Sequence, residues 1–151
     1  MGDVITLENY FPKCRYEVKN IHVEDLLKPE YSKIEKYFKV EGKWTTEQKN
    51  NFIESLLFGF IAPSIFIYQD KDNNRFIIDG FNRIKTINEF MNDEFSLSNM
   101  SQYNWFNNGK IYSRLNESVK YKFDNCPVAV NLITKITNEE DLKQLYINLN
   151  I

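Results

Sequence analysis

The sequence predicts an α+β domain, because strand-like and helix-like segments are mixed along the chain. Short runs rich in β-branched and aromatic residues are interspersed with runs whose apolar residues recur every three or four positions. The length of 151 residues is typical of one domain with a sizeable core. We therefore expect a single domain over residues 1–151, in the order strand, helices, strand, strand, helix, strand, helix.

The first part of the chain predicts a short strand followed by helical structure. Residues 16–23 alternate well enough for a strand, with His22 as a polar position on one face. Residues 24–40 have the apolar spacing of a helix that is interrupted near Pro29.

The next helix has recognisable ends. Thr45 is a suitable N-cap, and Gln48 three residues later gives the spacing of a capping box. Gly59 suits the left-handed position that follows a helix, and Pro63 prevents the helix from continuing.

A hairpin and a further helix come next. Residues 64–69 and 75–79 are β-rich runs, and the turn-forming residues 70–74 join them. A helix begins directly after Gly80, with apolar residues at helical spacing: Ile84, Ile87 and Met91.

The last third of the chain predicts an irregular segment, a strand and a helix. Residues 93–123 look irregular, aromatic and polar. Residues 128–133, after Pro127, form a buried type of strand. Thr137 and Glu140 have the spacing of a second capping box, so the final helix is expected to begin there.

Composition excludes several classes of protein. A net charge of −2 argues against a chain that binds nucleic acid over its whole surface, although a local basic face stays open. Cys14, Cys126 and His22 are too few for a zinc site of four such ligands, and the cysteine spacing favours reduced thiols. No apolar stretch has the length of a membrane span and no signal-type start is present, so we expect a cytoplasmic protein that does not bind membranes.

The chemically informative point is the junction at Asp79, Gly80 and Arg83, where a strand runs directly into a helix. The first N–H groups of a helix have no internal partner and lie at the positive end of its dipole, so they can bind an anion. Gly80 allows close backbone approach, and the Arg83 fork suits phosphate oxygens. Asp79 could bind a metal, hold a ribose hydroxyl or orient Arg83. The alternative is an ordinary helix cap in which Arg83 simply pairs with Asp79.

The surrounding sequence resembles a known family. The resemblance rests on these segments, in chain order: Trp44, Phe52–Gly59, Pro63, Ile65–Ile67, Ile78–Thr86, Phe90, Phe95 and Leu145–Asn150. They are similar to the ParB/sulfiredoxin-like domain at the N-terminus of GmrSD-type modification-dependent restriction enzymes, whose motif usually reads Asp-Gly-Gln-Gln-Arg-Leu-Thr-Thr. The resemblance implies a small mixed sheet with packed helices, and a role in restriction or phage–host conflict. The chain stops where relatives continue into helical or nuclease regions.

The resemblance also implies nucleoside triphosphate binding, with hydrolysis as a further expectation. In the family the motif is tied to both activities, and related ParB domains hold CTP with Gly-x-x-Arg at such a junction. The carry-over makes Asp79 and Arg83 the candidate catalytic residues, Asp79 the candidate ligand of Mg²⁺, and Gly80, Asn82, Arg83 and Thr86 the candidate nucleotide-binding residues. Supporting roles fall on Trp44, Glu54 and Ser55.

The chain departs from the family pattern in ways that affect hydrolysis more than binding. Phe81 and Asn82 replace the two glutamines, and Lys85 replaces a threonine. Asn82 can still form hydrogen bonds, whereas the Phe81 side chain cannot. The arginine that usually precedes the tryptophan is absent before Trp44, where Lys39 or Lys43 could supply only a point charge.

Two other functions stay open. The first is a non-enzymatic module that binds DNA or a protein through aromatic and basic residues: Tyr103, Trp105, Phe106, Lys110, Tyr112, Arg114, Lys120 and Lys122. An aromatic core patch with solvated lysines explains the same residues. The second is a metal-dependent DNA nuclease using Glu54, Asp79 and Glu89, although these acids lack the spacing of a metal site. The sequence does not specify an oligomeric state.

Overall fold

The computed structural model describes residues 12–39, 42–98 and 110–150. Its elements, in chain order, are β1 (Cys14–His22), the 3₁₀ helix η1 (Val23–Leu27), α2 (Pro29–Ser32), β2 (Glu35–Lys36), α3 (Thr46–Leu57), β3 (Ile65–Gln69), β4 (Arg75–Asp79), α4 (Phe81–Met91), the 3₁₀ helix η3 (Tyr112–Arg114), α5 (Glu117–Asp124), β5 (Pro127–Ile136) and α6 (Glu139–Leu149). The predicted α+β class is confirmed. None of the described helices is both long and apolar enough to cross a membrane.

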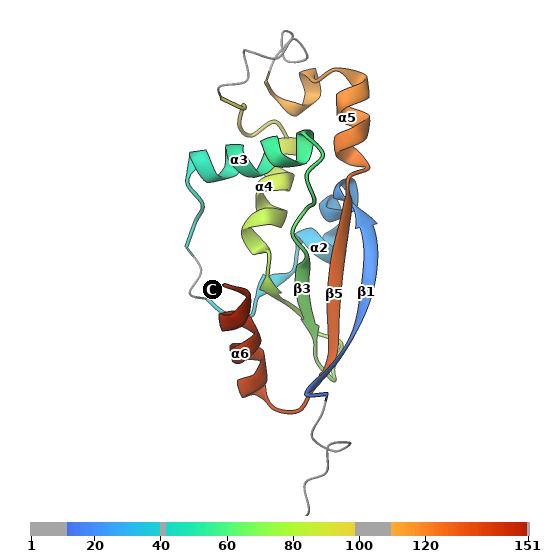
Figure 1. The fold of residues 1–151 in the computed structure, drawn as a ribbon, viewed down its shortest axis with the longest axis vertical. Coiled ribbons are helices and arrows are strands. Elements are labelled where there is room, and N and C mark those ends of the chain that lie inside the picture. The colour runs from blue at the N-terminus through green and yellow to red at the C-terminus, as the bar shows by residue number, and fades with distance from the viewer. Residues whose placement is uncertain (1–11, 40–41, 99–109, 151) are drawn as a thin grey trace, which may run out of the picture.

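The five described strands form one mixed sheet in the order β1-β5-β3-β4-β2 (Figure 1). β1 pairs antiparallel with β5, and β3 pairs antiparallel with β4. β5 and β3 are parallel, as are β4 and β2. The β3–β4 pair is therefore an internal hairpin, and β1 and β2 occupy the two edges.

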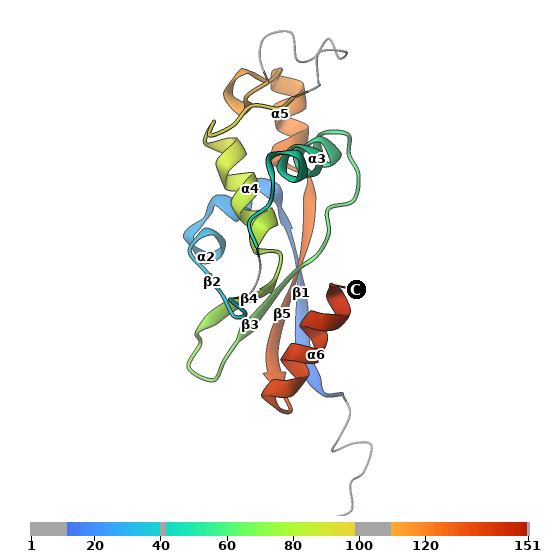
Figure 2. The same ribbon diagram turned by 90° about the vertical axis from the view of Figure 1, so that its left-hand side faces the viewer.

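Helices cover both faces of the sheet, because alternate residues of its central strands are apolar on both sides. Ile65, Ile67 and Ile77 belong to a larger core with α2, α3, α4 and α5. Ile78 and Ile133 belong to a smaller core that Leu142 of α6 completes. Figure 2 shows α2 and α6 on opposite sides of the strands.

The ends of α3 and the start of α4 follow from local sequence. Gln48 N donates to Thr45 Oγ1 at 3.2 Å, while Thr45 N donates to Gln48 Oε1 at 2.8 Å, which confirms the predicted capping box. Gly59 adopts a φ of 79°, the left-handed conformation expected after the helix. Gly80, with a φ of 111°, is the N-cap of α4.

The helix predicted over residues 24–40 is wrong in its second half. Lys33 ends the short helix α2, and Glu35–Lys36 form strand β2 instead. Tyr37 N donates to Ile77 O at 2.9 Å, so backbone groups that a helix would use internally bond to β4. Val40 lies outside the described residues.

The structure also corrects the C-terminal third. The segment predicted to be irregular contains η3 and α5, and Asn116 caps α5 by accepting a hydrogen bond from Ser118 N at 2.8 Å. α6 is capped by Asn138, not by Thr137. The Thr137 hydroxyl instead donates to Lys13 O at 2.9 Å, and this bond removes it from the capping position.

Candidate functional site at the β4–α4 junction

The backbone turns from strand to helix within a single residue. β4 ends at Asp79, Gly80 takes the left-handed conformation, and α4 begins at Phe81. The first hydrogen bond of the helix runs from Ile84 N to Gly80 O at 3.0 Å. Because glycine has no side chain, it leaves the first-turn N–H groups without a side-chain cap. A Cβ at Gly80 would lie 3.4 Å from Ile65, so the backbone also packs closely on β3.

The Arg83 guanidinium is fixed at this junction by two acceptors. Its Nη2 donates to Asp79 Oδ2 at 2.6 Å, and its Nη1 donates to Ser64 O at 2.5 Å. The side chains of Arg83 and Asp79 are only 17% and 8% exposed. An arginine carries five N–H groups, so these two bonds hold the fork in place and leave others for a ligand.

Asn82 and Thr86 lie on the same helix as Arg83 and are both buried. Asn82 is buried, and its Nδ2 donates to Gly42 O at 2.9 Å. This bond attaches the backbone just before Trp44 to the first turn of α4. Thr86, one turn further on, is almost completely buried, with 1% exposure. Its hydroxyl therefore lies in the interior of the fold.

The three supporting candidates lie on or near α3. Trp44 is half-buried and packs edge-on against Phe52, with ring centroids 5.4 Å apart. Glu54 and Ser55 are half-buried on the second half of α3. The Ser55 carbonyl accepts from Phe60 N at 3.0 Å, as part of the end of the helix.

The acidic residues proposed for a nuclease do not converge on one point. Glu89 pairs with Lys49 at 2.7 Å and lies 4.0 Å from Lys85. Across residues 12–39, 42–98 and 110–150, no group of three His, Cys, Asp or Glu side chains could hold a metal ion. Asp79 itself is engaged by Arg83.

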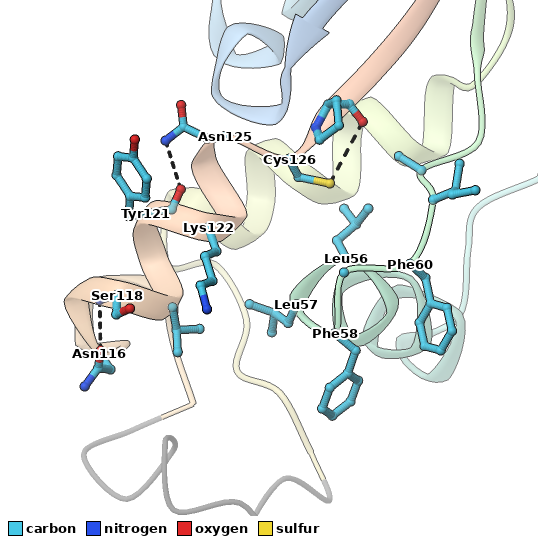
Figure 3. Close-up of a pocket in the computed structure, with 15 residues that line it drawn as sticks. Leu56, Leu57, Phe58, Phe60, Asn116, Ser118, Tyr121, Lys122, Asn125 and Cys126 are labelled. Atoms are coloured by element: carbon cyan, nitrogen blue, oxygen red, sulfur yellow. Dashed lines mark hydrogen bonds between the residues drawn. The ribbon is translucent and has the colours of Figure 1, made fainter.

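The described residues form two hollows. An apolar groove of about 1080 Å³ lies between the end of α3 and α5, and Figure 3 shows Leu57, Phe58 and Lys122 on its walls. A hollow of about 420 Å³ lies between α2 and the face of α4 that carries Phe81 and Lys85. The apolar groove contains no residue of the junction, whereas the smaller hollow adjoins the junction through Phe81, the first residue of α4. The junction positions charged groups, and the larger groove is mainly apolar.

The described part of the aromatic and basic set is largely structural. Tyr112 donates its hydroxyl to Asp124 at 2.5 Å, and Lys120 lies 5.0 Å from the centre of the Tyr112 ring. Burial and the Asp124 carboxylate raise the pKa of Tyr112 well above its ordinary range. Lys110 and Tyr112 are half-buried, whereas Arg114 and Lys122 are exposed. Tyr103, Trp105 and Phe106 lie outside the described residues.

Sequence reasoning missed the main-chain groups that complete the junction. The carbonyls of Ser64 and Gly42 bind Arg83 and Asn82 across separations of 19 and 40 residues. Every residue has a carbonyl, so no residue type marks these acceptors. Pro63, which directly precedes Ser64, is the nearest sequence signal.

Comparison with known proteins identifies the family. Residues 23–151 match the family model described as GmrSD restriction endonuclease, N-terminal domain. The match covers most of the chain, which therefore belongs to this family and is linked to restriction endonuclease function. No curated protein and no solved structure matches the chain.

Proposed function

We propose that this member of the GmrSD N-terminal domain family binds a nucleoside triphosphate at the β4–α4 junction. The observation that carries the proposal is the pairing of an uncapped helix start at Gly80 with an arginine fork already held in place. Backbone N–H groups of the first turn of α4 would donate hydrogen bonds to one phosphate group of the nucleotide. The remaining N–H groups of Arg83 would donate to the same phosphate or to the adjacent one. The family resemblance supports the same residues.

Asp79 contributes chiefly by orienting Arg83. Its carboxylate is 2.6 Å from the guanidinium, so it is not a free base for activating a water molecule. The arrangement therefore supports binding more strongly than hydrolysis. Mg²⁺ fits this site as an ion held largely by the phosphates and water, with Asp79 as the adjacent carboxylate. When bound, such an ion would neutralise phosphate charge.

Calorimetric titration tests the proposal. ATP, GTP, CTP and UTP, each with Mg²⁺, would be titrated into the parent, Arg83→Ala, Arg83→Lys and Arg114→Ala. Arg114 is an exposed arginine outside the junction, so its loss is the matched control. We expect Arg83→Ala to weaken binding at least about tenfold and Arg83→Lys to restore part of the loss, because lysine keeps the charge without the fork.

Folding and binding must be separated in this test. Circular dichroism would establish that Arg83→Ala is folded, and inorganic triphosphate would compete with the nucleotide if the phosphates dominate recognition. Equal affinity of the folded Arg83→Ala variant and the parent would refute the junction as the phosphate site.

Binding of a partner protein is the second candidate, and the apolar groove favours it. Phe60, Ile61 and Tyr121 beside the groove are 66%, 95% and 70% exposed. Clusters of this kind commonly mark interaction sites. The fluorescence of an anilinonaphthalene sulfonate probe should fall in Ile61→Glu and stay unchanged in Ile147→Glu, whose site is remote from the groove. DNA binding would instead give a mobility shift that weakens steeply with salt.

A further inference from the structure

Among the described strands, none pairs with the outer edge of β1. β1 is the last strand in the sheet order, and no other described element lies outside it (Figure 1). Its residues from Arg15 to Asn20 are all exposed. An edge strand presents unpaired N–H and C=O groups to which another strand can bond. β1 also precedes Val23, where the family match begins, so this surface is contributed by residues outside the match.

The side chains of β1 divide into a charged and an apolar row. Glu17 and Lys19 pair with Leu132 and Val130 of β5, which places them on the face covered by α4. Their side chains are 60% and 45% exposed, and Lys19 Nζ lies 4.0 Å from Glu17 Oε1.

The apolar row lies on the opposite face. Tyr16 and Val18 pair with Ile133 and Asn131, on the face that α6 covers in part. They are 60% and 53% exposed. Large apolar side chains on an unpaired edge are a recognised site for association with another strand.

We propose that β1 pairs antiparallel with β1 of a second copy of this chain, about a two-fold axis through Val18. Antiparallel pairing about such an axis sets residues that share a face opposite one another. Glu17 of each copy then lies opposite Lys19 of the other, and Val18 lies opposite Val18. The two sheets join into one continuous sheet.

Charge selects this register over its neighbours. Moving the axis to Glu17 places Glu17 against itself and Arg15 against Lys19, while moving it to Lys19 places Lys19 against itself. Like charges directly opposite one another destabilise a strand pair, whereas opposite charges stabilise it. The bulge between Arg15 and Tyr16 interrupts β1, so regular pairing is not expected to extend before Tyr16. A partner strand without matching charges offers Glu17 and Lys19 no ion pair beyond the 4.0 Å contact that they already make with each other, so the row favours a second copy over an unrelated strand.

A charge-exchange experiment tests the partner. Pairing of about five residues per strand makes a small interface, so we expect weak dimers that appear in sedimentation equilibrium between about 10 μM and 1 mM. Glu17→Lys and Lys19→Glu should each weaken self-association about tenfold or more, because both symmetric pairs become repulsive. An equimolar mixture of these two variants, and the double variant Glu17→Lys/Lys19→Glu, should recover it. Glu94→Lys and Lys71→Glu are the charge-matched controls, because both residues are exposed and lie outside β1.

A cross-link tests the register. Residues directly opposite in an antiparallel pair have Cα atoms roughly 4.5–5.5 Å apart, which is within disulfide range. Val18→Cys, in a Cys14→Ser background, should form a covalent dimer under mild oxidation, whereas Tyr16→Cys in the same background should form far less. A parent that stays monomeric at every concentration, or a dimer indifferent to Glu17→Lys, would overturn the proposal.

Discussion

Arg83 Nη2 lies 2.6 Å from Asp79 Oδ2, and this ion pair joins the first turn of α4 to the last residue of β4. The same guanidinium donates to Ser64 O, immediately before β3. Arg83 of α4 therefore links the helix to the end of β4 and to the residue before β3, at the point where we propose that phosphates bind. The fold itself positions the charged group, which would lower the ordering cost of the phosphate binding that we propose.

Asp79→Asn should lower the free energy of unfolding by about 2 kcal/mol. The substitution removes one charge of a largely buried pair and leaves the other without full compensation, although Arg83 keeps its bond to Ser64. Glu35→Gln is the matched control, because Glu35 and Lys39 form an ion pair of the same spacing with side chains 79% and 68% exposed. Its effect should stay within about 0.5 kcal/mol. Urea unfolding of both variants measures the contrast, and equal losses would contradict it.

Gly80→Ala should cost more stability than Gly59→Ala. Both glycines have positive φ, so alanine at either position introduces backbone strain of about 1–2 kcal/mol. The φ of 111° at Gly80 lies further from the left-handed region that alanine can adopt than the φ of 79° at Gly59. A Cβ at Gly80 would also contact Ile65 at 3.4 Å, so alanine there has less freedom to relax, whereas at Gly59 nothing lies within 4 Å. Thermal unfolding of the two variants gives the ranking, and equal losses would contradict it.

Asn82→Asp should destabilise the protein more than Asn82→Ala. Alanine removes the hydrogen bond to Gly42 O, at a cost of about 1 kcal/mol. Aspartate removes the donor and also places a carboxylate of similar size in a site that is only 7% exposed, so we expect a loss of about 2–3 kcal/mol at neutral pH. Denaturant midpoints at pH 7 give the ranking. The reverse ranking would mean that Gly42 O is not the main partner of residue 82.

Local patterns predicted most of the fold, and dependence on long-range pairing explains why strand β2 was missed. The capping box of Thr45 and Gln48 and the hairpin turn after Gln69 depend on residues close in the chain, so they are readable from the sequence. β2 has only two residues, and its conformation depends on its pairing with β4. Its residues therefore looked like a continuation of the preceding helix.

The candidate site was predicted in its side chains but not in its full set of contacts. The spacing of Asp79 and Arg83 is local, and the structure brings them together as an ion pair. The carbonyls of Ser64 and Gly42 lie far from the junction in the sequence, and only the tertiary structure brings them close to it. The same ion pair also holds β4 and α4 together, so Arg83 has a structural role beside the phosphate binding that we propose.

Stability should fall at alkaline pH, in part through Tyr112. Burial and the hydrogen bond to Asp124 raise the pKa of Tyr112 above its ordinary value of 10.0. Above about pH 10 the unfolded chain therefore loses a proton that the folded protein keeps, and the free energy of unfolding falls as pH rises. Burial also raises the pKa of Tyr31, Tyr37 and Tyr68, which add to the same trend in any variant that retains them.

Tyr112→Phe separates the contribution of this one residue. At pH 8 the variant should be less stable by about 1–2 kcal/mol, because Asp124 loses the donor 2.5 Å away. Phenylalanine has no proton to lose, so the variant should lose stability less steeply between about pH 9 and pH 11. The difference between the two urea midpoints should therefore narrow as pH rises. A difference that stays constant over this range would mean that Tyr112 has the same pKa in the folded and unfolded states, and that its bond to Asp124 contributes no preference for the protonated hydroxyl.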